Sequence, residues 1–182
     1  MSSALVIAMP GNERFAGETA AALDAETGQI ETRHFPDGES YIRFRSDVRG
    51  RGWQPSPALD RPDGKYLPLH FAAAVARELG ASKVGLVAPY LAYMRQDRRF
   101  HEGEAVTSVT FARLLSSAFD WLVTVDSHLH RMGSLGEIYS IPAKAAHAAP
   151  LISEWIKANV AHPVIIGPDA ESEQWVAAVA AS

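Results

Sequence analysis

The chain has 182 residues, of which 47% are hydrophobic, and this composition fits one domain of ordinary size with a packed core rather than a disordered segment. Zero cysteines exclude disulfides, thiolate metal sites and a cysteine nucleophile, so any metal must be bound by His, Asp or Glu. No apolar run could span a bilayer, no cationic leader precedes the first apolar stretch, and the formal charge of -4 gives no general attraction for nucleic acid. We therefore expect a cytoplasmic protein with neither membrane nor nucleic-acid partners.

The first part of the chain predicts a strand, a helix and a hairpin. Residues 5–9 form an apolar strand, and alanines and leucine at helical spacing follow over residues 15–23. The extended segments 30–34 and 41–44 flank Pro36-Asp37-Gly38, which is a tight-turn signal. These segments predict a small hairpin that projects from the domain.

The rest of the chain alternates strands with helices. Strands are expected over residues 84–88, 121–125 and 164–166, and helices over residues 66–79, 106–118, 149–160 and through Trp175 and Val179. This alternation predicts an α/β fold of three layers, in which helices cover both faces of a mostly parallel sheet. We expect residues 1–182 to form a single α/β domain.

Residues 50–57 break this rhythm. Their sequence, GRGWQPSP, contains two glycines and two prolines around a tryptophan at a point where the alternation leads one to expect a strand. Proline removes a ladder donor and glycine weakens a strand interior, so this segment does not easily form an interior strand. Either the sheet lacks a strand at this point or the strand has an unusual sequence.

Polar side chains follow the predicted strands at their carboxyl ends, where open parallel sheets collect their ligands. The polar cluster Arg95-Gln96-Asp97-Arg98-Arg99 follows the strand at 84–88. The other two exits carry oxygen and imidazole groups that suit a hard divalent cation, namely Asp126, His128, Asp169 and Glu171. With the arginines to neutralise phosphates, and Tyr90, Tyr93 or Phe100 to offer a face to a base, these residues describe a nucleotide-phosphate site.

Other interpretations of the same residues stay open. The arginine cluster alone fits a solvated loop as well as it fits a ligand site, and Asp37 and Glu39 fit simple turn residues. The spacing Asp126-x-His128-x-His130 also suits the ligand set of a zinc hydrolase. For His130 and His147, a hydrogen-bonded structural role is the more common one.

Short motifs along the chain resemble a known family. Phe35-Pro36-Asp37-Gly38-Glu39, Pro89-Tyr90 leading into Arg95-Gln96-Asp97-Arg98, Thr124-Val125-Asp126-x-His128, Ile141-Pro142 and Gly167-Pro168-Asp169 occur in this order. Each motif is short, but their common order over nearly the whole chain resembles the N-terminal half of the ribose-phosphate pyrophosphokinases. The resemblance implies a phosphoribosyltransferase-like fold.

The resemblance also implies an activity in nucleotide biosynthesis. It implies Mg²⁺-dependent transfer of the diphosphoryl group of ATP to ribose 5-phosphate, which gives phosphoribosyl pyrophosphate and AMP. Carried over by position, Arg95, Gln96 and Asp97 bind ATP, and Arg95 and His128 act in catalysis. His128 and Asp169 lie at the metal.

The hairpin has an implied role of its own. In the family this projection reaches the adenine site of a neighbouring subunit, so Phe35, Asp37 and Glu39 are expected to bind ATP in a homo-oligomer with shared sites. An aromatic ring and two acceptors suit a base that carries an amino group.

The family's C-terminal half supplies a basic catalytic loop and a loop that binds the ribose phosphate, and neither pattern occurs in these residues. We therefore expect the 182-residue chain alone to be inactive as a ribose-phosphate diphosphokinase. The alternative is a non-catalytic regulatory subunit of the same family. Because such associated proteins degrade the site motifs, the intact Arg95-Gln96-Asp97 and Asp126-x-His128 favour the enzyme.

Overall fold

The computed structural model describes residues 4–129, 131–167 and 172–181. By its internal contacts the chain divides into two compact units, Met1–Ala145 and Ala146–Ser182. The first unit contains the sheet, and the second contains two helices. Asp169, His130 and Glu171, to which the sequence assigned metal-site or alternative roles, lie outside the described residues. The expectation of a single domain over the whole chain stays a prediction.

A six-stranded sheet forms the centre of the fold. Its order is β2 (Glu26–Gly28), β1 (Ala4–Ala8), β5 (Gly52–Ser56), β6 (Lys83–Ala88), β7 (Trp121–Val125) and β8 (Ala143–Ala146). Every pairing recorded from β2 across to β7 is parallel. Parallel neighbours require crossover connections, which the intervening helices supply. The strands predicted at residues 5–9, 84–88 and 121–125 are confirmed as β1, β6 and β7. Strands β2 and β8 were not predicted.

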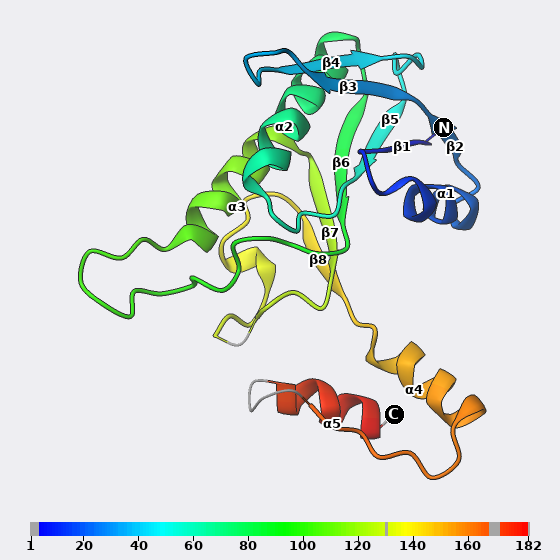
Figure 1. Ribbon diagram of the computed structural model, residues 1–182, viewed down its shortest axis with the longest axis vertical. Coiled ribbons are helices and arrows are strands. Elements are labelled where there is room, and N and C mark those ends of the chain that lie inside the picture. Colours follow the sequence, from blue (N-terminus) through cyan, green and yellow to red (C-terminus); the bar gives the residue numbers. More distant parts are fainter. Residues whose placement is uncertain (1–3, 130, 168–171, 182) are drawn as a thin grey trace. The chain divides into compact units, whose positions relative to one another are not determined.

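Helices cover both faces of this sheet, as the sequence predicts. Leu5 and Ile7 of β1 belong to the main buried cluster, which includes residues of α2 (Asp63–Glu78) and α3 (Thr107–Ala118). Val6, between them, instead packs with Ala16 and Ala20 of α1 (Glu13–Ala22) on the other face. In Figure 1, α1 accordingly lies on the opposite side of β1 from α2. Successive side chains of a strand point to opposite faces, so one strand supplies both cores.

The sheet has not lost a strand at residues 50–57, because β5 is an interior strand between β1 and β6. Its pairing with β1 runs from Gly52 to Ser56, but its recorded pairing with β6 stops at Trp53. Pro55 therefore lies beyond the β6 ladder, where a missing N–H costs no bond to that neighbour. Trp53 is completely buried and packs edge-on against Phe44, with ring centroids 5.1 Å apart. Burial of this large ring stabilises the strand despite its glycine and proline.

The predicted hairpin is confirmed. Strand β3 (Ile30–His34) pairs antiparallel with β4 (Ser40–Phe44), with Ile30 opposite Phe44 and His34 opposite Ser40. The turn closes through the N–H of Phe35, which donates to the carbonyl of Glu39 at 2.8 Å. Gly38 has φ +91°, a left-handed conformation that glycine adopts without steric cost. Figure 1 shows this hairpin crossing one end of the sheet layer.

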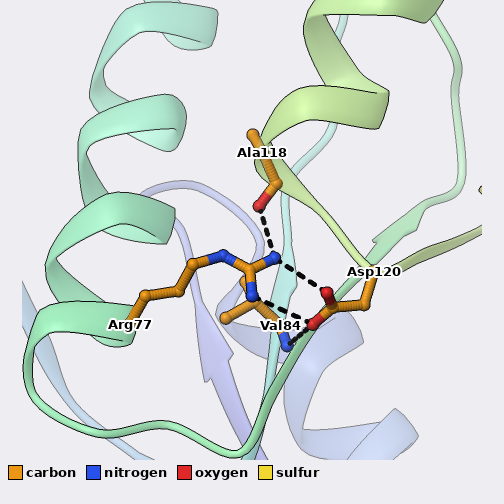
Figure 2. A network of polar contacts seen from close by, with 4 residues as sticks. All are labelled: Arg77, Val84, Ala118 and Asp120. Carbon is orange, nitrogen blue, oxygen red and sulfur yellow. Dashed lines mark hydrogen bonds and ion pairs between the residues drawn. The ribbon is translucent and has the colours of Figure 1, made fainter.

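A polar network ties α2 and α3 to the amino end of β6 (Figure 2). Arg77 Nη2 donates to Asp120 Oδ1 at 3.0 Å and to the carbonyl of Ala118 at 3.1 Å, while the N–H of Val84 donates to Asp120 Oδ2 at 2.7 Å. Burial alone would raise the pKa of Asp120, but the Val84 N–H and the Arg77 guanidinium outweigh it and lower that pKa below its ordinary value. The negative charge of Asp120 is thus stabilised by partners within the fold.

The second unit contains α4 (Ala149–Asn159) and α5 (Glu173–Ala181). The predicted strand at residues 164–166 is wrong, since this segment has no strand conformation. Val164 and Ile166 are each 84% exposed. A strand needs a hydrogen-bonded neighbour, and a run of three apolar residues does not by itself specify one. None of the helices in the described part of the chain is long and apolar enough to cross a membrane.

Candidate functional site

The two polar strand exits predicted from the sequence start side by side. Strands β6 and β7 are parallel neighbours, with Ala88 paired to Thr124 at their carboxyl ends. Directly beyond this pair, the N–H of Val125 donates to the carbonyl of Pro89 at 3.3 Å. The loop that contains Arg95 and the loop that contains His128 therefore leave the same edge of the sheet. This edge is where open parallel sheets bind ligands.

A pocket of about 330 Å³ lies at this edge. It is lined by Arg61, Pro62, Tyr90, Ala92, Tyr93, Arg95, Gln96 and Thr107. The carbonyl of Gln96 accepts from the N–H of Ser108 in the first turn of α3 at 3.3 Å, which holds the loop against that helix. The structure thus brings together Arg95 and Gln96, the first two predicted ATP ligands, in one recess.

Asp97, the third of these predicted ligands, is engaged differently. Arg131 Nη1 donates to its Oδ1 at 3.2 Å and to its Oδ2 at 3.1 Å, and only 1% of the Asp97 side chain is exposed. Asp97 is also absent from the residues that line the pocket. In this structure its carboxylate joins the loop after β6 to the loop after β7. Sequence reasoning assigned no role to Arg131, because a pair 34 residues apart leaves no local pattern.

The three aromatic residues proposed to face a base have different surroundings. The ring of Tyr93 packs 4.7 Å from that of Phe111, and its hydroxyl donates to Asp63. The guanidinium carbons of Arg98 and Arg131 lie 4.7 Å and 5.5 Å from the centroid of the Phe100 ring. Tyr90 is 49% exposed and lines the pocket beside Arg95. Of the three rings, Tyr90 therefore has the position best suited to stack on a ligand in this pocket.

The loop after β7 begins with a residue in a left-handed backbone conformation. Asp126 has φ +41°, a left-handed conformation that costs energy for a residue other than glycine, and Ser127 behind it is buried. His128 follows and is half-buried. Strained residues of this kind cluster at ligand sites, so the conformation of Asp126 agrees with a functional role for this exit.

The metal site predicted from His128 and Asp169 is not tested by these residues, because Asp169 lies outside the described part. Among the described residues, no group of three or more His, Asp or Glu side chains gathers to hold an ion. Mg²⁺ commonly uses one or two protein groups and takes its other ligands from water and substrate phosphates. The oxygen and imidazole donors of the strand exits suit that mode better than a closed protein cage. The zinc ligand set stays untested, since His130 is not described either.

The predicted hairpin ligands lie apart from this pocket within the first unit. Figure 1 shows the β3–β4 turn well separated from the long loop that follows β6. Asp37 Oδ1 accepts from the N–H of Glu39 at 3.2 Å, which is a turn interaction. Phe35 is partly exposed, and its ring makes an edge contact with Tyr41 at 6.0 Å. Phe35, Asp37 and Glu39 are therefore placed on a projection rather than at the Arg95 pocket of the same chain.

Comparison with known proteins adds evidence independent of this geometry. Residues 4–118 match the family model for the N-terminal domain of ribose phosphate pyrophosphokinase. The chain is 37% identical over 166 residues to the ribose-phosphate pyrophosphokinase of Methanothermobacter thermautotrophicus. This alignment covers 91% of this chain and 57% of that protein. It is 39% identical over 145 residues to the ribose-phosphate pyrophosphokinase of Saccharolobus solfataricus, which covers 78% of this chain and 48% of that protein.

A solved structure shows the same fold. The crystal structure of phosphoribosylpyrophosphate synthetase from Mycobacterium smegmatis superposes with a TM-score of 0.84 and 22% identity, over 100% of this chain and 61% of that one. The chain therefore spans about half the length of the relatives it matches. Residues 4–118, which match the family model, include β1 to α3 and with them the residues that line the Arg95 pocket. This chain belongs to the family of the N-terminal domain of ribose-phosphate pyrophosphokinases.

Proposed function

We propose that this chain is the nucleotide-binding part of a ribose-phosphate diphosphokinase, which transfers diphosphate from ATP to ribose 5-phosphate and releases AMP. The observation that carries the proposal is the position of Arg95 and Gln96 in a pocket at the carboxyl edge of the sheet. Family membership supports the same assignment. Positioning and charge neutralisation supply most of the catalysis in phosphoryl transfer, which suits a site built from arginines and a metal.

In this proposal Arg95 binds the phosphates of ATP and neutralises charge that develops during transfer. Its guanidinium presents several donors in a planar fork that matches phosphate oxygens. Gln96 holds the loop against α3 through its carbonyl, and as a residue that lines the pocket it contacts the nucleotide. Asp97 acts through its ion pair with Arg131, which fixes the loop that carries Arg95.

Mg²⁺ is the proposed cofactor, and His128 and Asp169 are the residues that would hold it. When bound to phosphate oxygens, Mg²⁺ neutralises negative charge on ATP. His128 follows the strained Asp126 at the end of β7, beside the exit of β6 that leads to Arg95. In this proposal the fold keeps the His128 imidazole at the carboxyl ends of β6 and β7, where the phosphates would bind.

The hairpin supports a proposal about assembly. Phe35, Asp37 and Glu39 belong to the β3–β4 turn and do not line the Arg95 pocket of their own chain, so they suit contact with ATP bound to a second copy. In a homo-oligomer of this kind each adenine site is shared between subunits. Replacement of Phe35 by Ala would then weaken ATP binding only in the assembled protein.

Binding of Mg-ATP to the purified chain tests the proposal. We expect weak binding, measured by NMR titration, with signals shifted for residues around the pocket and affinity lowered about tenfold or more by Arg95→Ala. Arg14→Ala is the matched control, because this exposed arginine lies on α1 and pairs with Glu18 of the same helix. Absence of Mg-ATP binding to the native chain, or equal losses in both variants, would contradict the assignment.

Turnover requires a separate test. We expect the 182-residue chain to form no AMP from ATP and ribose 5-phosphate, and robust AMP formation would contradict that expectation. A chimaera can supply the remaining half from the Methanothermobacter thermautotrophicus enzyme, with which the chain aligns over 166 residues. In an active chimaera, His128→Ala and Arg95→Ala should each lower kcat about a hundredfold without lowering Tm. Unchanged kcat in both variants would remove these residues from the catalytic site.

A further inference from the structure

The loop between β5 and α2 brings a second arginine to the Arg95 pocket. Arg61 lies near the end of this loop, two residues before α2 begins at Asp63. It lines the pocket together with Arg95, Gln96 and Tyr90. The family motifs in the sequence do not include this loop. Sequence analysis alone gave Arg61 no role, because the loop is brought to the exit of β6 only by the fold.

The backbone of Arg61 is strained. Its φ is +49°, in the left-handed region that residues other than glycine rarely occupy. Strain of this kind persists where the surrounding structure holds the residue in place, and it is concentrated at ligand sites. A glycine would adopt the same backbone without strain, so the local turn does not require an arginine.

The charge of Arg61 is not consumed by the fold. The neighbouring carboxylate, Asp60, is bound by Lys65, whose Nζ lies 2.5 Å from Oδ1 and also donates to the carbonyl of Ala58 at 3.0 Å. Lys65 is the main cause of the lowered pKa of Asp60, and the charge of Arg61 contributes less. In the part of the chain that the structure describes, no hydrogen bond or ion pair engages the Arg61 guanidinium. Asp63, the next carboxylate, accepts from the Tyr93 hydroxyl.

We infer that Arg61 is a second phosphate-binding residue of the nucleotide site, which acts with Arg95 on the polyphosphate of ATP. The inference rests on the proposed function. Two guanidinium groups around one pocket fit a ligand with several anionic phosphates better than one with a single phosphate. Arg61 therefore favours nucleoside triphosphates and tripolyphosphate over AMP.

The test is an NMR titration of the purified chain with Mg-ATP, Mg-tripolyphosphate and AMP. Arg61→Ala should weaken binding of Mg-ATP and Mg-tripolyphosphate about tenfold, since one charge-assisted interaction is lost, and should change AMP binding less than about twofold. Arg61→Lys should fall between the native chain and Arg61→Ala, because it keeps the charge without the planar fork.

Arg61→Gly separates a binding role from a structural one. Glycine removes the side chain and relieves the left-handed strain, so this variant should lose the same affinity as Arg61→Ala while its Tm stays equal to or above the native value. Arg14→Ala should leave affinity unchanged. Native binding of Mg-ATP that is lowered by Arg95→Ala but not by Arg61→Ala or Arg61→Gly would overturn this inference alone. A native chain that binds no Mg-ATP would overturn the proposed function with it.

Discussion

Charged side chains have opposite roles at the two ends of the parallel strands. At the amino-terminal ends of β6 and β7, here called the amino edge, Asp120 and Arg77 form an ion pair and also bind the backbone at Val84 and Ala118 (Figure 2). At the carboxyl edge, Arg61 and Arg95 line a pocket, and the backbone is left-handed at Arg61. Charges that are satisfied within the fold stabilise it, while charges left around a recess are available to a ligand.

The amino edge is also closely packed, which gives the largest expected effect on stability. A Cβ on Gly85 would lie 1.9 Å from Trp121, its partner across β6 and β7. Gly85→Ala should therefore lower the free energy of unfolding by about 3 kcal/mol, because a rigid indole ring must move. Gly64→Ala is the control, since a Cβ there meets nothing within 4 Å. Urea unfolding measures both, and equal stability of the two variants would show that the amino edge is not closely packed.

The carboxyl edge contains one internal pair that should behave like the amino edge. Arg131→Ala leaves the buried Asp97 carboxylate without its counter-charge, and we expect a loss of about 2 kcal/mol, reduced from the cost of a fully buried pair because Arg131 is partly exposed. The double variant Asp97→Ala with Arg131→Ala should recover part of this loss. A single variant as stable as the native chain would show that Asp97 does not depend on Arg131.

Loss of the Asp120 charge should have a smaller effect, because both partners of its ion pair are partly exposed. We expect Asp120→Asn to cost about 1 kcal/mol at neutral pH, because the Asn oxygen can still accept from the Val84 N–H, whereas the Asn NH2 cannot accept from Arg77. Chemical denaturation at pH 7 measures this cost. If Arg14→Ala, which breaks a pair far more exposed to solvent, were equally costly, the special role of the amino-edge network would be lost.

The same variant should flatten the acid limb of the stability profile. The pKa of Asp120 is lower in the folded chain than its ordinary value of 3.8. Its contribution is therefore fully present above about pH 3.8 and is lost as the pH falls through the lower folded pKa. The gap in stability between the native chain and Asp120→Asn should be constant from about pH 5 to 7 and should close below that range. A gap that widens on acidification would contradict the sign of this shift.

Sequence patterns predicted the regular part of the first unit well. Apolar periodicity located β6, β7 and the helices before them, and the Pro36-Asp37-Gly38 turn located the hairpin. The misses have physical causes. Strand β2 is three residues long and β8 reads AKAA, so neither has the apolar or β-branched pattern of a strand. Strand β5 stayed undecided from sequence, because its glycine and proline oppose a strand and the burial of Trp53 that outweighs them depends on the folded sheet.

The candidate site was predictable only in part. Motifs and strand ends indicated Arg95, Gln96 and His128, since residues after parallel strands gather at one edge whatever the details of the fold. Arg61 and Arg131 come from other loops, and only tertiary structure brings them to the pocket and to Asp97. The burial of Asp97 could not be predicted either, because a cluster of polar residues in the sequence indicates a solvent-exposed loop.

The most direct measurement compares the Mg-ATP affinity of Arg95→Ala with that of Arg77→Ala, one arginine from each edge of the sheet. If the carboxyl edge binds the nucleotide, Arg95→Ala weakens binding about tenfold or more at unchanged Tm, while Arg77→Ala lowers Tm and leaves affinity unchanged. Equal affinity in both variants, or a loss confined to Arg77→Ala, would contradict the account that the carboxyl edge is the ATP site.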